Sequence, residues 1–268
     1  MVEPTSRPAA PFKEGQVEAD GHRIRYLEAG RGHAVVILDG MTWGLLHLHA
    51  ALAQTYRVIA LELPGFGRSP ANTTSQSVQD LANTAAQAMA QLLPDPYTLI
   101  GTSFAANVAL WQTLQVPDQI EALILISPTS IQPVDSPWTG TPETLSRQLL
   151  AHPEHPAALP AVDPAIFVKE QALVQRLQGA THDTAAERKL GEIPCATLVV
   201  FGSKDRMVAP EAASVYREKI PNCNMVIVYD AGHVILAERP EALISVVADY
   251  VERRETFIVG RQNRMVNP

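Results

Sequence analysis

Short, mainly apolar runs alternate with longer stretches of helical spacing along most of this chain. Runs of this length are typical of strands that are buried on both faces of a parallel sheet, and they stand at residues 34–38, 56–61, 97–100, 122–127, 196–201 and 225–229. Between them, helical spacing is found in segments 43–53, 77–93, 107–111, 211–220 and 240–254. The alternation predicts an α/β fold with a mainly parallel sheet of roughly eight strands and helices on both faces.

One long segment departs from this alternation. Residues 130–191 are rich in Pro, His, Ala and Leu and contain no strand-like run, so we expect an inserted helical lid. A helix is expected after Pro142, a second over residues 163–179 and a third over 183–190. The second begins at Asp-Pro and ends at Gly, which suit the start and the end of a helix.

The remaining boundaries follow from local signals. Residues 17–27 predict a hairpin closed at Asp20-Gly21, because Asp-Gly is a favoured two-residue hairpin turn. The expected organisation is a flexible N-terminal arm at 1–16, an α/β core formed by 17–129 and 192–255, the lid at 130–191, and a C-terminal tail at 256–268.

Composition narrows the class of protein. The chain has 268 residues, 46% of them hydrophobic and 18% charged, which is ample material for a core. A net charge of −7 without a basic run argues against a nucleic-acid partner. We see neither a signal peptide nor an apolar run long enough to cross a bilayer, and the two cysteines suggest no disulfide framework. These features favour a cytoplasmic protein without a membrane partner; the oligomeric state is left open.

The clearest chemical motif is Gly101-Thr102-Ser103-Phe104-Ala105, which joins a predicted strand directly to a predicted helix. A strand that turns at once into a helix with Ser at the apex is a nucleophile elbow. Such a turn needs small residues where strand and helix meet, and Gly101 and Ala105 fit. The motif predicts a nucleophilic Ser103.

A nucleophilic Ser needs a base, and the base needs a carboxylate to orient it. His233 follows the last predicted strand, and Asp205 follows the strand before it. Since the carboxyl ends of parallel strands meet at one edge of a sheet, both side chains are expected beside Ser103. Asp135 is the best substitute for Asp205. His22, His47, His49, His152 and His155 have structural explanations, and no metal site or cofactor is expected.

Acyl transfer also requires donors for the oxyanion. The backbone N–H of Phe104 is one candidate, and that of Met41, in the loop after strand 34–38, is the second. Apolar residues at the expected site, Trp43, Leu149, Phe167, Val174 and Val234, are the candidate substrate pocket.

With these motifs the chain resembles the α/β-hydrolase superfamily, in its lid-bearing branch of esterases, C–C bond hydrolases, cofactor-free haloperoxidases and epoxide hydrolases. Further matches are residues 37–40, 63–69, and Glu238 to Glu241 after the Gly-His pair. The resemblance implies Ser103 as nucleophile, His233 as base, Asp205 as orienting acid, and Met41 with Phe104 as oxyanion hole. Epoxide hydrolases and dehalogenases have Asp at the elbow, so Ser103 argues against those activities.

Three residues differ from the family pattern: Asp39 where His is usual, Glu62 where Asp is common, and Ala105 where the elbow usually ends in Gly. An inward Asp39 would repel an oxyanion, so we expect it to turn away. The leading hypothesis is hydrolysis of small to medium apolar carboxylic esters through an acyl-enzyme. C–C bond hydrolysis, perhydrolase or haloperoxidase chemistry, and a non-catalytic ligand-binding protein remain alternatives.

Overall fold

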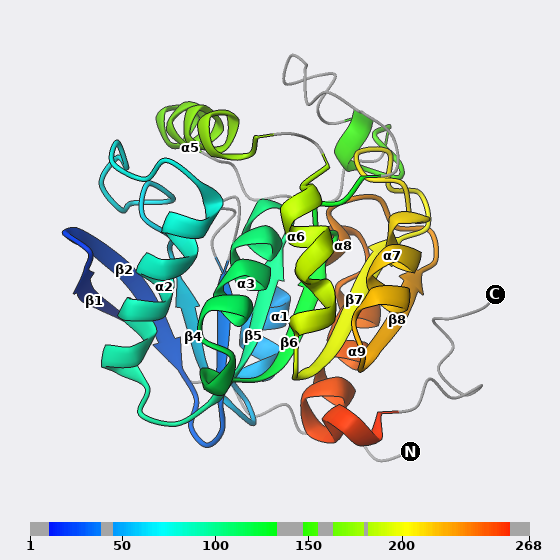
Figure 1. The fold of residues 1–268 in the computed structure, drawn as a ribbon, viewed down its shortest axis with the longest axis horizontal. Helices are drawn as coiled ribbons and strands as arrows, with labels where there is room; N and C mark the ends of the chain where they lie inside the picture. The colour runs from blue at the N-terminus through cyan, green and yellow to red at the C-terminus, as the bar shows by residue number, and fades with distance from the viewer. Residues whose placement is uncertain (1–10, 39–44, 133–146, 155–162, 180–181, 258–268) are drawn as a thin grey trace.

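A computed structural model describes residues 11–38, 45–132, 147–154, 163–179 and 182–257. An eight-stranded sheet forms its centre, in the order β1-β2-β4-β3-β5-β6-β7-β8 (Figure 1). The first two strand pairs, β1 with β2 and β2 with β4, are antiparallel, and all later pairs are parallel. The predicted mainly parallel sheet is therefore confirmed. The strands are β1 (Lys13–Ala19), β2 (His22–Ala29), β3 (Ala34–Leu38), β4 (Arg57–Leu61), β5 (Tyr97–Thr102), β6 (Ile120–Ile126), β7 (Ala196–Gly202) and β8 (Cys223–Val228).

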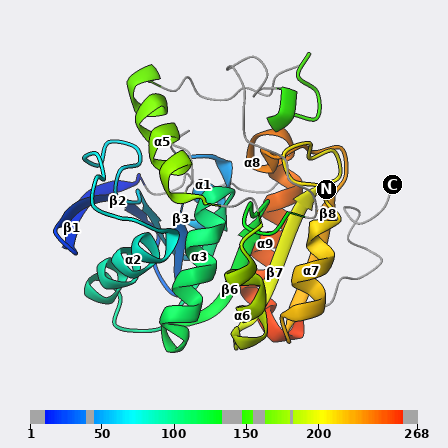
Figure 2. The same ribbon diagram turned by 45° about the horizontal axis from the view of Figure 1, so that its top comes forward.

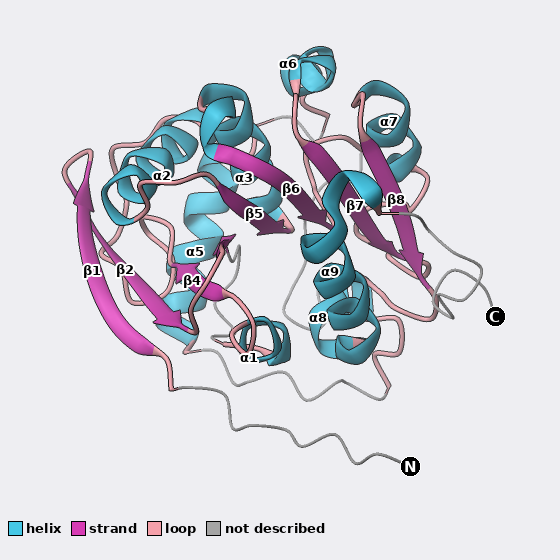
Figure 3. Ribbon diagram, turned by 90° about the horizontal axis from the view of Figure 1, so that it is seen from below, coloured by secondary structure: helices cyan, strands magenta, loops and turns pink. Residues whose placement is uncertain are grey.

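Helices cover both faces of the sheet, as expected (Figure 3). One layer contains α2 (Val78–Leu92), α3 (Phe104–Gln115), α6 (Thr184–Lys189) and α7 (Ala212–Lys219). The other contains α1 (His47–Leu52), α8 (Ile235–Glu238) and α9 (Pro240–Arg253). Successive strand residues point to opposite faces, so Val36 and Leu38 pack in one apolar cluster while Val35 and Ile37 pack in the other. Single 3₁₀ turns are η1 (Pro117–Gln119), η2 (Leu190–Glu192) and η3 (Arg254–Thr256).

Both ends of the core extend further than expected. The hairpin is present, and its turn residues Asp20 and Gly21 have φ of 50° and 73°. However, β1 already begins at Lys13, so residues 13–16 are a paired strand and not part of a flexible arm. At the other end, Phe257 is buried and its ring packs edge-on against that of Tyr250, with the ring centroids 5.0 Å apart. The core therefore extends beyond residue 255.

The insertion leaves and re-enters the core at one point, because the Asp183 amide donates to the Ser130 carbonyl at 2.7 Å. Within it, α5 (Pro164–Leu177) lies outside both helical layers (Figure 2). The Asp163 side chain caps α5 as the sequence predicts. By contrast, α6 lies beside α3 and α7, with Ala186 fully buried in the larger core cluster. The predicted lid boundary at residue 191 is therefore too late. Of the helix expected after Pro142, residues 147–149 are described and are helical, and the part before residue 147 lies outside the described residues.

Candidate active site

Ser103 stands at the turn between β5 and α3 with φ 51° and ψ −122°. This left-handed conformation is costly for a residue with a side chain, and such strain concentrates at functional sites. The Ser103 amide donates to the Ile126 carbonyl at the end of β6 at 2.8 Å, which fixes the turn against the neighbouring strand. The strand-to-helix elbow predicted from the sequence is present.

Strand and helix approach closely at this elbow. A β-carbon on Gly101 would lie 2.6 Å from the Ala105 carbonyl oxygen and 2.6 Å from the Ala106 Cα. Both contacts are with backbone atoms, which cannot rotate away, and Ala105 is fully buried. Small residues are therefore required here, as the motif indicated.

Three side chains from three loops form one hydrogen-bonded chain. Ser103 Oγ lies 2.8 Å from His233 Nε2, and His233 Nδ1 lies 2.9 Å from Asp205 Oδ2. The other carboxylate oxygen, Oδ1, accepts from the amides of Met207 and Val208, both at 2.9 Å. Because a carboxylate only accepts, Nδ1 of the ring must donate to it, and in the neutral ring Nε2 then has a lone pair directed at the Ser hydroxyl.

Asp205 and His233 are shielded from water, whereas Ser103 is partly exposed. The Asp205 side chain is 0% exposed and that of His233 is 3% exposed. In a water-poor site, a carboxylate that is fixed by two backbone amides holds its neighbour in one orientation. The arrangement can therefore transfer a proton from the Ser103 hydroxyl to the imidazole.

Several predicted site residues lie outside the described part of the chain: Asp39, Met41, Trp43, Asp135 and His155. The other predicted oxyanion donor, Phe104, is the first residue of α3, and its ring stacks on Phe66 with centroids 5.9 Å apart. Its backbone N–H thus belongs to the positive end of a helix. Glu62, one of the departures from the family pattern, forms an ion pair with Arg25 and accepts from the Arg68 amide at 3.0 Å.

Two other histidines and a cysteine illustrate structural roles away from Ser103. His49 is buried in α1, where its Nδ1 accepts from the Leu46 amide at 3.1 Å, and His22 bonds the Thr74 hydroxyl at 2.9 Å. Burial raises the pKa of the Cys195 thiol to about 11, so this thiol is a poor nucleophile. Among the described residues, no group of three or more His, Cys, Asp or Glu side chains is placed to hold a metal ion.

Three of the predicted pocket residues come together. Leu149 and Val234 pack in one apolar cluster, with Phe167 partly buried against it. Val174 lies in the larger core cluster and is 4% exposed, so it packs α5 onto the core. Sequence reasoning missed Met207 and Ala237, which also pack on this cluster. The available signal was their position, two residues after Asp205 and four residues after His233.

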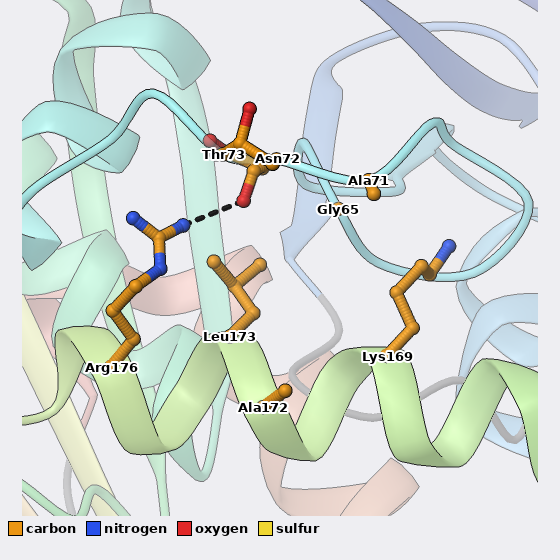
Figure 4. Close-up of a pocket in the computed structure, with 8 residues that line it drawn as sticks. All are labelled: Gly65, Ala71, Asn72, Thr73, Lys169, Ala172, Leu173 and Arg176. Carbon is orange, nitrogen blue, oxygen red and sulfur yellow. Dashed lines mark hydrogen bonds between the residues drawn. The ribbon is translucent and has the colours of Figure 1, made fainter.

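A separate pocket of about 410 Å³ lies between α5 and the loop that follows β4 (Figure 4). Lys169 donates to the carbonyls of Gly67 and Ser69, both at 2.7 Å, while Arg176 donates to the Asn72 carbonyl at 2.6 Å. Burial lowers the pKa of Lys169. Ser103, Asp205 and His233 are not among the residues that line this pocket. Lys169 and Arg176 both bond backbone carbonyls of the loop after β4, so we interpret these contacts as the ones that hold α5 to the core.

A charged cluster adjoins the His233 loop. His152 Nε2 lies 2.8 Å from Asp230 Oδ1, and Lys204 Nζ lies 2.5 Å from the same oxygen. Hydrogen bonds from Lys204 and His152 lower the pKa of Asp230 to about 2, and the bond to Asp230, followed by that to Glu154, raises the pKa of His152. His152 thus links the inserted segment to the loop that carries His233.

The sheet order, the elbow and the inserted helical segment together define an α/β hydrolase fold. A model of the Alpha/beta hydrolase family matches residues 21–246, and the chain belongs to that family. No helix in the described residues is long and apolar enough to cross a membrane.

Individual relatives are distant. The chain is 23% identical to a 2-hydroxy-6-oxo-6-(2'-aminophenyl)hexa-2,4-dienoic acid hydrolase of Metapseudomonas resinovorans, over 91% of this chain and 92% of that one. It is 26% identical to a pimeloyl-[acyl-carrier protein] methyl ester esterase of Aeromonas hydrophila, over 83% and 96%. Among solved structures it is similar to a bacterial membrane phospholipase A, with a TM-score of 0.77, 23% identity, and 90% and 86% of the two chains covered.

Proposed function

We propose that this protein is a serine hydrolase that cleaves carboxylic esters through an acyl-enzyme intermediate on Ser103. The observation that carries the proposal is the continuous hydrogen-bonded chain from the Ser103 hydroxyl through His233 to the buried carboxylate of Asp205. Family membership and an esterase among the relatives support it.

In the proposed mechanism, Ser103 Oγ attacks the ester carbonyl carbon as its proton passes to Nε2 of His233. The oxyanion is stabilised by the backbone N–H groups of Phe104 and Met41. The tetrahedral intermediate collapses when the imidazolium gives its proton to the leaving alcohol, and the acyl group stays on Ser103. His233 then takes a proton from a water molecule as the water attacks the acyl carbon. The second tetrahedral intermediate breaks its bond to Ser103 Oγ, which recovers the proton from the imidazolium, and the acid is released.

The proposed substrates are small to medium apolar esters, because Leu149, Phe167 and Val234 form an apolar cluster beside His233, whose amide donates to the Leu149 carbonyl at 2.8 Å. The test is hydrolysis of p-nitrophenyl acetate, butyrate and octanoate by the wild type and by Ser103→Ala. We expect turnover that is lost in the variant. If Ser103→Ala retained the wild-type rate, the mechanism would be wrong.

A second candidate is hydrolysis of a C–C bond in a dienoate-type ketone. The observation that favours it is the relative whose name describes a hexa-2,4-dienoic acid hydrolase, which the chain matches over 91% of its length. Ser103-dependent cleavage of such a diketo acid, without cleavage of the nitrophenyl esters, would select this candidate. Absence of turnover on both substrate classes would favour a non-catalytic ligand-binding role.

A further inference from the structure

The short helix α8 begins two residues after His233 and turns the chain back on itself. The Glu238 amide donates to the Val234 carbonyl at 3.1 Å, which closes this turn. As a result, the Glu238 side chain reaches Gly232, six residues earlier and directly before His233. The helix thus brings a carboxylate within hydrogen-bond distance of the loop that carries His233.

The Glu238 carboxylate bonds two segments that are distant in the sequence. Its Oε2 accepts from the Gly232 amide at 2.7 Å, and its Oε1 accepts from the Ala151 amide at 2.7 Å. Ala151 belongs to lid segment 147–151, 87 residues earlier in the chain. We call these two hydrogen bonds the Glu238 bridge.

The lid segment touches the His233 loop at further points. The amides of His233 and Val234 both donate to the Leu149 carbonyl, at 2.8 and 3.3 Å. A β-carbon on Gly232 would lie 2.6 Å from the Ala151 nitrogen, so the two backbones are in direct contact. The lid segment and the His233 loop are therefore built as one unit, in which the bridge supplies the charged bonds.

We infer that Glu238 is a positioning residue for His233, which sets the imidazole between Asp205 and Ser103 by holding both the Gly232 amide and lid segment 147–151. This inference rests on the proposed function of His233 as the base. A carboxylate is needed because both partners are N–H donors. A glutamine offers one accepting oxygen, and its NH₂ group would face the second amide donor to donor.

The test compares Glu238→Gln with Glu241→Gln, an exposed glutamate three positions along the chain, on p-nitrophenyl butyrate. For Glu238→Gln we expect kcat to fall by about tenfold or more with KM changed less than twofold, since a misplaced base slows chemistry and leaves substrate binding intact. Inactivation of Ser103 by phenylmethylsulfonyl fluoride should slow by the same factor. We also expect the acid limb of the kcat/KM profile to move in Glu238→Gln and to stay in place in Glu241→Gln.

Two measurements do not depend on turnover. Hydrogen exchange should increase in both 147–154 and 228–234 of Glu238→Gln, and formate should raise the melting temperature of Glu238→Ala without raising that of Glu241→Gln. If the wild type lacks Ser103-dependent activity, the proposed function fails, and these two measurements still decide whether the bridge exists. The inference would be overturned if Glu238→Gln and Glu241→Gln had the same kcat, the same rate of inactivation by phenylmethylsulfonyl fluoride and the same hydrogen exchange.

Discussion

Replacement of Asp205 by Asn tests the hydrogen-bonded chain most directly, because the change is isosteric and its consequence can be derived from the contacts. Asp205 Oδ1 accepts from two backbone amides, while Oδ2 faces His233 Nδ1. An Asn must therefore place its carbonyl oxygen toward the two amides and its NH₂ group toward the ring. His233 then accepts at Nδ1 and carries its proton on Nε2, which can no longer take the proton of Ser103.

The expected loss follows from this tautomer. Removing the base in this way costs roughly 10³- to 10⁴-fold in kcat, or about 4 to 5.5 kcal/mol of transition-state stabilisation. Stability should fall by only about 1 to 2 kcal/mol, since the two backbone hydrogen bonds survive as neutral bonds. The assay is hydrolysis of p-nitrophenyl butyrate, with urea unfolding in parallel and Asp118→Asn, at an exposed position, as the control. A loss of less than tenfold in a folded Asp205→Asn protein would refute the reasoning.

Two other predictions follow from contacts in the same region. Gly101→Ala should lower the free energy of unfolding by about 1 to 3 kcal/mol and impair turnover, because the added β-carbon would lie 2.6 Å from backbone atoms. The control is Gly191→Ala, whose added β-carbon would have ordinary contacts. Equal urea midpoints for the two variants would contradict this prediction. The raised pKa of His152 means that its pairing with Asp230 stabilises the fold fully below pH 6.5 and is lost as pH rises through the raised value. The difference in melting temperature between the wild type and His152→Gln should shrink over that window, and a constant difference would count against the pairing.

The parts of the fold that the sequence predicts are those set by local pattern. Apolar strands buried on both faces, the Asp-Gly turn and the capped helix α5 each have a signal within a few residues. The convergence of Ser103, Asp205 and His233 follows from the same pattern, because each comes just after a parallel strand and such strands end at one edge. For this reason, the arrangement of these three residues could be predicted without any information on long-range contacts.

What the sequence did not predict depends on packing between distant segments. The sequence of a short helix such as α6 does not show whether the helix belongs to the inserted segment or packs on a face of the sheet. Burial of Ala186 in the larger core cluster shows that α6 packs on the core. Strand residues 13–16, Lys-Glu-Gly-Gln, include no apolar side chain, and pairing with β2 defines them as a strand. Phe257 follows a helix end, and its burial depends on Tyr250.

Three of the contacts that hold the inserted segment to the core share a feature, which bears on why fold and substrate are unequally predictable. Glu238 bonds backbone amides, while Lys169 and Arg176 bond backbone carbonyls, so each of these side chains recognises the main chain of its partner segment. Backbone groups are the same for every residue except Pro. The side chains of the bonded segments can therefore change without loss of these bonds, and an insertion anchored in this way can vary its apolar side chains while His233 stays in place. The sequence motifs of the fold and of the proposed site can therefore be recognised. The identity of the proposed substrate depends instead on apolar residues that the bonds of Glu238, Lys169 and Arg176 do not restrict.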